Sequence, residues 1–158
     1  MKILLLIALA HACVMGFAQQ YYKKIPISKV NYERRTTATQ FAKEYIEKCN
    51  TKNYKPFEGF LIASKMNSIL KTSFKRNCLK NEELFGKMTL MDLESVHLQK
   101  FSEDKDPIDL LIYPIKTEKG HTELFLNLWI YHDQNYISGL VISERKYNET
   151  LKKEKSQE

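Results

Sequence analysis

The chain has 158 residues, of which 43% are hydrophobic and 28% are charged, and its net charge is +6. This hydrophobic content is normal for a globular protein and too high for a disordered one, and a chain of this length most often forms one domain. The basic residues are scattered and do not alternate with aromatic ones, so we expect no nucleic-acid partner. The basic clusters are Lys23-Lys24, Arg34-Arg35, Lys75-Arg76 and Lys152-Lys153-Lys155.

Residues 1–18 have the three parts of a secretory signal peptide. Lys2 supplies the positive start, residues 3–10 form an unbroken apolar run, and small residues precede a cleavage point after Ala18. We therefore expect a secreted or periplasmic protein, with the net charge lowered from +6 to +5 by the loss of Lys2. Two alternatives stay open: a membrane anchor, for which the run is short, and lipidation of Cys13. No later segment is apolar over about 18 residues, so we expect no membrane contact after cleavage.

Cys49 and Cys78 are the cysteines that remain after such cleavage. An oxidising compartment permits a disulfide between them, and closing that loop would stabilise the fold by about 3–4 kcal/mol. Two independent buried thiols are the alternative. The cysteines lack C-x-x-C spacing and the histidines lack metal-ligand spacing, so we expect no redox centre, no metal and no other cofactor.

The domain boundaries follow from composition. Residues 19–37 are polar and are predicted to form an extended leader, and residues 148–158 a disordered tail. A single domain occupies 38–147 between them. Apolar residues at helical spacing predict a first helix over 38–51. Pro56 suits the first position of a short second helix.

A third helix is predicted between Ser64, which can cap it, and Gly86, which can stop it. Its apolar face would carry Met66, Ile69, Leu70, Phe74 and Cys78.

Strand-like segments follow Gly86. Residues 88–101 are predicted to form one long or bulged strand, followed by strands over 108–117, 122–132 and 136–144. A tight hairpin joins the last two. Helices followed by antiparallel strands predict an α+β fold, with the N-terminal helices packed on one face of a curved antiparallel sheet.

The strand over 122–132 has two alternating rows of side chains. We expect its aliphatic row to face the helices, which places the other row on the far face. Large aromatic side chains on a solvated face predict a partner surface, and we expect homodimerisation there. A second core layer, or burial under residues 19–37, is the alternative. The aliphatic row is Leu124, Leu126, Leu128 and Ile130, and the other is Phe125, Asn127, Trp129 and Tyr131.

A family resemblance extends over about residues 38–144. It is carried by residues 40–45, by Asn53-Tyr54-Lys55-Pro56-Phe57, by Phe85-Gly86-Lys87 and by the closing hairpin over 131–140. These stretches resemble the nuclear transport factor 2-like superfamily, in particular its small secreted bacterial members of the DUF3887-like kind. The resemblance implies a cone formed by a sheet wrapped around helices, a pocket for a small apolar ligand, and dimerisation through the sheet. Enzymes of the superfamily place Asp, His or Tyr in that pocket.

Candidates for catalysis are few. Asp92 and His97 lie in one predicted strand, and Asp109 and Tyr113 lie on its predicted neighbour. As a general acid or base, such a group must come within hydrogen-bond reach of a substrate. The chain has neither a Gly-x-Ser-x-Gly nor a His-Glu-x-x-His motif, so we assign no catalytic residue.

Our first functional hypothesis is a secreted, non-enzymatic binding or assembly protein that dimerises through its sheet face. An isomerase or dehydratase with a small-molecule pocket inside the cone is the main alternative. A cystatin-like inhibitor or a polyanion binder is a second alternative. Residues 134–139 are one residue longer than the cystatin loop pattern Gln-x-Val-x-Gly and lack its valine.

Overall fold

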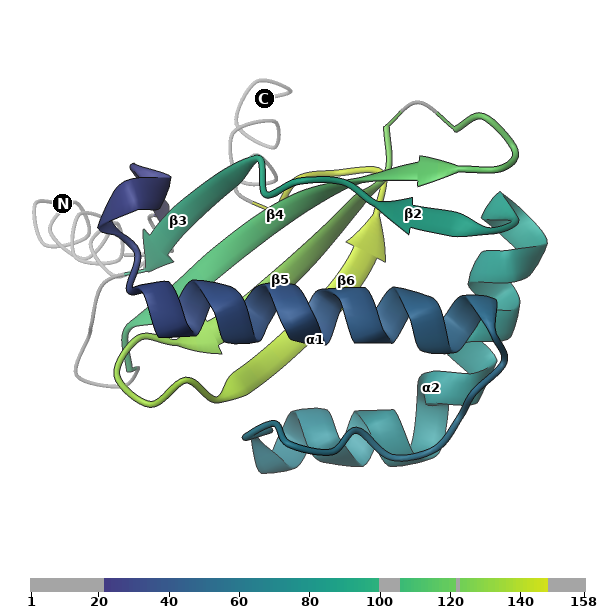
Figure 1. Ribbon diagram of the computed structural model, residues 1–158, viewed down its shortest axis with the longest axis horizontal. Coiled ribbons are helices and arrows are strands. Elements are labelled where there is room, and N and C mark those ends of the chain that lie inside the picture. Colours follow the sequence, from purple (N-terminus) through teal and green to yellow (C-terminus); the bar gives the residue numbers. More distant parts are fainter. Residues whose placement is uncertain (1–21, 100–105, 122, 148–158) are drawn as a thin grey trace, which may run out of the picture.

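The computed structural model describes residues 22–99, 106–121 and 123–147. Two helices pack on a six-stranded antiparallel sheet that does not close on itself, so the predicted α+β class is confirmed (Figure 1). The predicted signal peptide and the predicted tail lie outside the described residues. None of the described helices combines the length and apolarity that a membrane crossing requires.

The sheet has the strand order β1-β3-β4-β5-β6, and β2 pairs with the far end of β4. The strand predicted over 108–117 is confirmed at both ends, and the two that follow are slightly shorter than predicted. The long or bulged strand predicted over 88–101 is interrupted and forms two strands, which both pair with β4. They are separated because residues 91–94 lie opposite only two residues of β4, Tyr113 and Pro114, and so cannot continue the pairing in register. The strands are β1 (Tyr22–Ile25), β2 (Met88–Leu90), β3 (Ser95–Gln99), β4 (Ile108–Thr117), β5 (Phe125–Tyr131) and β6 (Ile137–Ser143).

Helix α1 (Tyr32–Asn50) begins before the predicted residue 38. Asn31 occupies its N-cap, and the Asn31 side chain accepts a hydrogen bond of 3.1 Å from the backbone N–H of Arg34. Capping of this kind satisfies an amide that has no partner inside the helix. The leader predicted over 19–37 is extended only in β1 within its described part. The prediction is wrong beyond it, where the 3-10 turn η1 (Ile27–Lys29) and the start of α1 follow.

Helix α2 (Ser64–Phe85) confirms the predicted third helix and ends at Gly86, whose φ of +71° lies in the left-handed region that favours glycine. Ser64 is not its cap, because Ala63 occupies the N-cap and makes no side-chain bond there. Ile69 is 44% exposed, so its predicted place on the core face is wrong. Met66, Phe74 and Cys78 are buried as predicted, and Leu70 is partly buried against the core.

The short helix predicted to begin at Pro56 is absent from the described structure, in which residues 53–63 run without helical turns. The carbonyl oxygens of Lys55 and Pro56 accept hydrogen bonds of 3.2 and 3.3 Å from the Lys48 ammonium. The Lys48 side chain of α1 thus donates hydrogen bonds to two carbonyls, which in a helix would accept from backbone amides of that helix.

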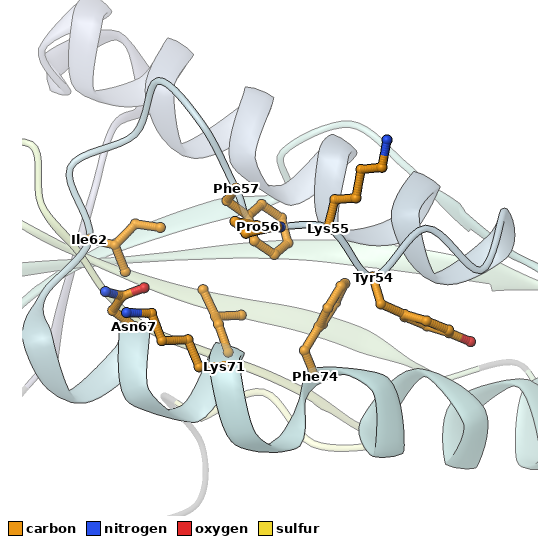
Figure 2. A pocket seen from close by; sticks show the side chains of 9 residues that line it. Tyr54, Lys55, Pro56, Phe57, Ile62, Asn67, Lys71 and Phe74 are labelled. Carbon is orange, nitrogen blue, oxygen red and sulfur yellow. The ribbon is translucent and has the colours of Figure 1, made fainter.

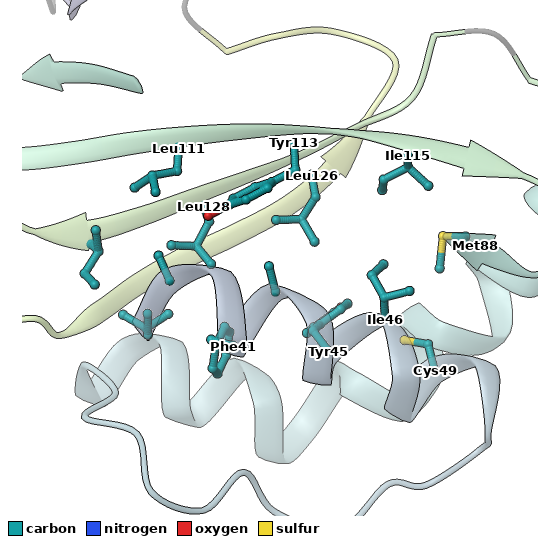
Figure 3. Close-up of a cluster of buried hydrophobic side chains, with 14 of the residues drawn as sticks. Phe41, Tyr45, Ile46, Cys49, Met88, Leu111, Tyr113, Ile115, Leu126 and Leu128 are labelled. Atoms are coloured by element: carbon teal, nitrogen blue, oxygen red, sulfur yellow. The ribbon is translucent and has the colours of Figure 1, made fainter. Parts of the chain in front are cut away.

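The hydrophobic core lies between α1 and the sheet (Figure 3). Phe41, Tyr45 and Ile46 of α1 face Leu111 and Tyr113 of β4. The aliphatic row, Leu124, Leu126, Leu128 and Ile130, belongs to the same core. This confirms the predicted orientation of that row. Leu126, Leu128, Leu111 and Tyr113 are each fully buried. The space where the superfamily resemblance implies a pocket is therefore occupied by side chains of α1, β4 and β5.

A disulfide joins Cys49 in the last turn of α1 to Cys78 of α2, with 4.9 Å between their Cα atoms. It fastens α2 to the helix that covers the sheet. Of the two states that the sequence permits, the structure has the bridge.

Two core tyrosines predict a loss of stability at high pH. Burial raises the pKa of Tyr45 to about 12 and that of Tyr113 to about 12. A hydrogen bond of 3.0 Å between the Thr39 and Tyr113 hydroxyls lowers the pKa of Tyr113, but by less than burial raises it. Both pKa values lie above the ordinary value of 10. The stability that depends on keeping these two hydroxyls protonated is therefore fully present below pH 10 and is lost as the pH rises towards 12. Each tyrosine should lower the free energy of unfolding by about 1.4 kcal/mol per pH unit in this range.

Urea unfolding measured between pH 9 and 12 tests this expectation. Tyr45→Phe should flatten the pH dependence, because it removes one of the two buried hydroxyls that titrate in this range. Parallel pH curves for the wild type and Tyr45→Phe would contradict the expected role of burial.

Candidate functional site

The four weak catalytic candidates do not form one site. Asp92 is exposed between β2 and β3, and His97 is buried on the far face of the sheet, where its Nε2 lies 3.2 Å from Ser95 Oγ. Asp109 and Tyr113 face the helices but lie four residues apart on β4, which corresponds to about 13 Å along a strand. No group of three His, Cys, Asp or Glu residues suited to a metal ion occurs in the described part of the chain.

Asp109 belongs to a buried ion pair. Its Oδ2 accepts a hydrogen bond of 2.6 Å from Arg34 Nη1, and its side chain is fully buried. His132 Nδ1 lies 2.8 Å from the same Arg34 nitrogen and 3.2 Å from Asp109 Oδ1. A neutral His132 ring with an unprotonated Nδ1 can accept from Arg34. The cluster joins the first turn of α1 to β4 and to the residue after β5, so its position is that of a structural link.

The far face of β5 is partly covered by the chain itself. Trp129 Nε1 donates a hydrogen bond of 3.0 Å to the Tyr22 hydroxyl, and the Trp129 ring meets the Tyr147 ring edge-on at 5.0 Å. Asn127 is fully buried, and its Oδ1 accepts a bond of 3.2 Å from the Tyr147 amide. The Lys146 ammonium lies over the Phe125 ring at 4.8 Å.

Two residues of β4 are also buried on this far face of the sheet. Leu110 and Ile112 are the direct cross-strand partners of Trp129 and Asn127, so they share the far face, and both are fully buried. Phe125, Trp129 and Tyr131 are only half-buried. The row predicted as a partner surface thus forms in good part a second buried layer, which is the alternative that the sequence left open.

An apolar pocket lies on the other side of the molecule, between residues 53–63 and the first half of α2 (Figure 2). Its volume is about 220 Å³. Rings from both sides form its walls: Phe57 lies 5.2 Å from Phe74, and Tyr54 lies 6.2 Å from Phe74 between ring centroids. Ile62 and Leu70 complete the apolar lining.

Lys48 holds one wall of this pocket in place. Its side chain is 9% exposed, and besides binding the carbonyls of Lys55 and Pro56 its ammonium lies 3.4 Å from Glu44 Oε1 and 5.1 Å from the centre of the Phe57 ring. A buried ammonium needs such partners, because burial of an unpaired charge is very costly. The wall is therefore anchored to α1 by a charge as well as by packing.

The core supports both walls from beneath. Phe41 of α1 contacts Phe57 at 4.9 Å and Phe60 at 5.1 Å in the wall of residues 53–63, and Tyr45 contacts Phe74 of α2 at 5.0 Å. The pocket is thus built on the rigid core, and rigid support of this kind reduces the ordering that a ligand must impose on binding.

Two polar side chains lie at one end of the pocket, and the Tyr54 hydroxyl lies towards the other end. Figure 2 shows Lys71 and Asn67 side by side at the first of these ends, whereas the Lys55 ammonium points away from the cavity. An apolar cavity with a few convergent polar groups is the usual form of a small-molecule site. A cation and an amide at one end suit a ligand with an apolar body and an anionic head.

Comparisons with protein-family models, with curated proteins and with solved structures give no match. The resemblance to the nuclear transport factor 2-like superfamily therefore stays a prediction.

Sequence reasoning missed most of these residues. The sequence predicts a helix start at Pro56, so the aromatic side chains of Tyr54 and Phe57 are not expected to line a cavity. Arg34 belongs to one of the scattered basic clusters of the sequence, but its side chain is only 8% exposed and is bonded to Asp109. The one available signal was the density of aromatic residues over 54–60, which is high for a surface loop.

Proposed function

We propose that this is a secreted, non-enzymatic binding protein that holds a small amphiphile, with an apolar body and an anionic head, in the pocket between residues 53–63 and α2. The observation that carries the proposal is the pocket itself: apolar walls fixed to the core, with Lys71 and Asn67 at one end. The Cys49–Cys78 disulfide supports secretion, because disulfides persist in oxidising compartments.

The main alternative, an enzyme acting inside the cone, has less support. Leu111, Tyr113, Leu126 and Leu128 fill the side of the sheet that such an enzyme would use. Asp109, the candidate on that side with a charge, is already paired with Arg34. A substrate there would have to displace both core packing and the ion pair.

Homodimerisation through the far face of the sheet stays a prediction. The half-buried rings of Phe125, Trp129 and Tyr131 support it. Tyr22 and residues 145–147 already contact that face, so they compete with a second copy for the same side chains.

Calorimetric titration with decanoate tests the proposed pocket, with decanol as the uncharged comparison. We expect decanoate to bind more tightly than decanol. Leu70→Trp, which fills the cavity, should abolish binding of both. Lys71→Met removes the charge but keeps the side-chain stem, and it should weaken decanoate binding about two- to fivefold, the range for an exposed ion pair.

Lys65→Met is the matched control, because Lys65 is an exposed lysine on the same helix that does not line the pocket. It should leave binding unchanged. Absence of decanoate binding, or equal binding to the wild type and Leu70→Trp, would contradict the proposal.

A further inference from the structure

Strand β6 is the last strand of the sheet, and its outer edge is only partly used. At its first residue, the Ile137 amide donates a 2.9 Å bond to the Leu61 carbonyl, and the Ile137 carbonyl accepts a 2.9 Å bond from the Ala63 amide. Beyond that point, no residue in the described ranges other than those of β5 pairs with the backbone of 138–143. The strand contains neither charged residues nor proline, which are the usual protections of an exposed edge.

A groove of about 300 Å³ follows this edge. It is formed by the second half of α2, by Tyr45 of α1 and by three consecutive residues of β6, Leu140, Val141 and Ile142. Successive side chains of a strand point to opposite faces. A cavity that is lined by three in a row therefore reaches the strand's edge, and Tyr45 bounds it on the side of the core.

Two amide side chains face the groove from the helix. Asn77 and Asn81 are half-buried, they lie one turn apart on α2, and neither side chain has a hydrogen-bond partner among the described residues. Side chains at this spacing have Cβ atoms about 5–6 Å apart, close to the roughly 6.6 Å between alternate residues of a strand. An amide offers both a donor and an acceptor, which is what a peptide backbone requires.

Lys80 is the charged side chain that lines the groove, and the exposed Leu84 lies next to it. A second copy of the chain would bring another Lys80 to the groove and no lining carboxylate. Charge thus favours an acidic partner over self-association.

We infer that the outer edge of β6 takes up an extended segment of another protein as an additional strand. Backbone hydrogen bonds to β6 hold one side of the segment, and Asn77 and Asn81 bind its other side. Alternate apolar residues of the segment pack on Leu84 and Leu140, and an acidic residue lies opposite Lys80. Addition of a strand to an open sheet edge is an established mode of peptide recognition.

Fluorescence anisotropy with a labelled peptide of alternating valine and glutamate tests the inference on the full chain. The peptide should bind, and the same peptide with N-methylated backbone amides should not, because it cannot donate to the edge. The double variant Asn77→Ala/Asn81→Ala should weaken binding about tenfold, as expected for two lost hydrogen bonds. Gln40→Ala, an exposed helical amide on α1, is the matched control and should bind as the wild type does.

Three results would overturn the inference: no binding of the unmodified peptide, equal binding of the N-methylated peptide, or unchanged binding by the double variant. Sedimentation velocity adds a fourth. A dimer that Asn77→Ala/Asn81→Ala converts to a monomer would show that a second copy occupies the groove. Decanoate binding at the pocket is independent of all four results.

Discussion

Asp109→Ala is expected to lower the free energy of unfolding by about 3–5 kcal/mol, because it leaves the Arg34 guanidinium buried without its carboxylate. This is a large fraction of the stability of an ordinary domain, which is about 5–15 kcal/mol. Arg34 also lies in the first turn of α1, where the helix dipole disfavours a cation. The Asp109 carboxylate also offsets this unfavourable interaction between the Arg34 charge and the helix dipole.

The double variant Arg34→Met/Asp109→Leu separates the cost of breaking the pair from the worth of the pair. Replacement of both partners by apolar residues of similar size is often close to neutral. Urea unfolding at neutral pH should therefore show the double variant to be more stable than Asp109→Ala. A change below about 1 kcal/mol for Asp109→Ala would show that the site is more hydrated than its burial indicates.

The disulfide provides the second large effect. Cys49→Ala/Cys78→Ala is expected to lower the free energy of unfolding by about 3–4 kcal/mol, because the unfolded chain regains the freedom of a loop of 29 residues. The effect on the pocket should exceed that on the sheet. The bridge fastens α2, which carries one wall of the pocket, to the end of α1.

Urea unfolding with and without dithiothreitol checks this expectation. The reductant should destabilise the wild type by a similar amount and should leave the double variant unchanged, which controls for the loss of the sulfur atoms from the core. Equal stability of oxidised and reduced wild type would contradict the assigned contribution.

The elements with a clear period were predictable from the sequence. Strand β4 and helix α2 were predicted nearly to the residue, because β-rich composition marks the first and a run of apolar residues ending at glycine marks the second. The aliphatic row of β5 faces the helices as its alternation required. These features depend on local pattern alone.

The features that were predicted wrongly depend on residues distant in the sequence. Residues 53–63 have no helical turns, and Lys48, a residue of α1, binds two of their carbonyls. The aromatic row of β5 is partly buried because Tyr22 and Tyr147, from opposite ends of the described chain, reach the same strand. Neither contact leaves a periodic trace in the sequence, and for the same reason the pocket could not be predicted.

We propose that the cavity between residues 53–63 and α2 is a binding site for an anionic amphiphile. Nuclear Overhauser effects between decanoate and the protein test it most directly. We expect contacts from the decanoate chain to the ring protons of Phe57 and Phe74, and their loss in Leu70→Trp. Contacts confined to Trp129 and Phe125 on the far face of the sheet, or no contacts to the protein, would contradict it.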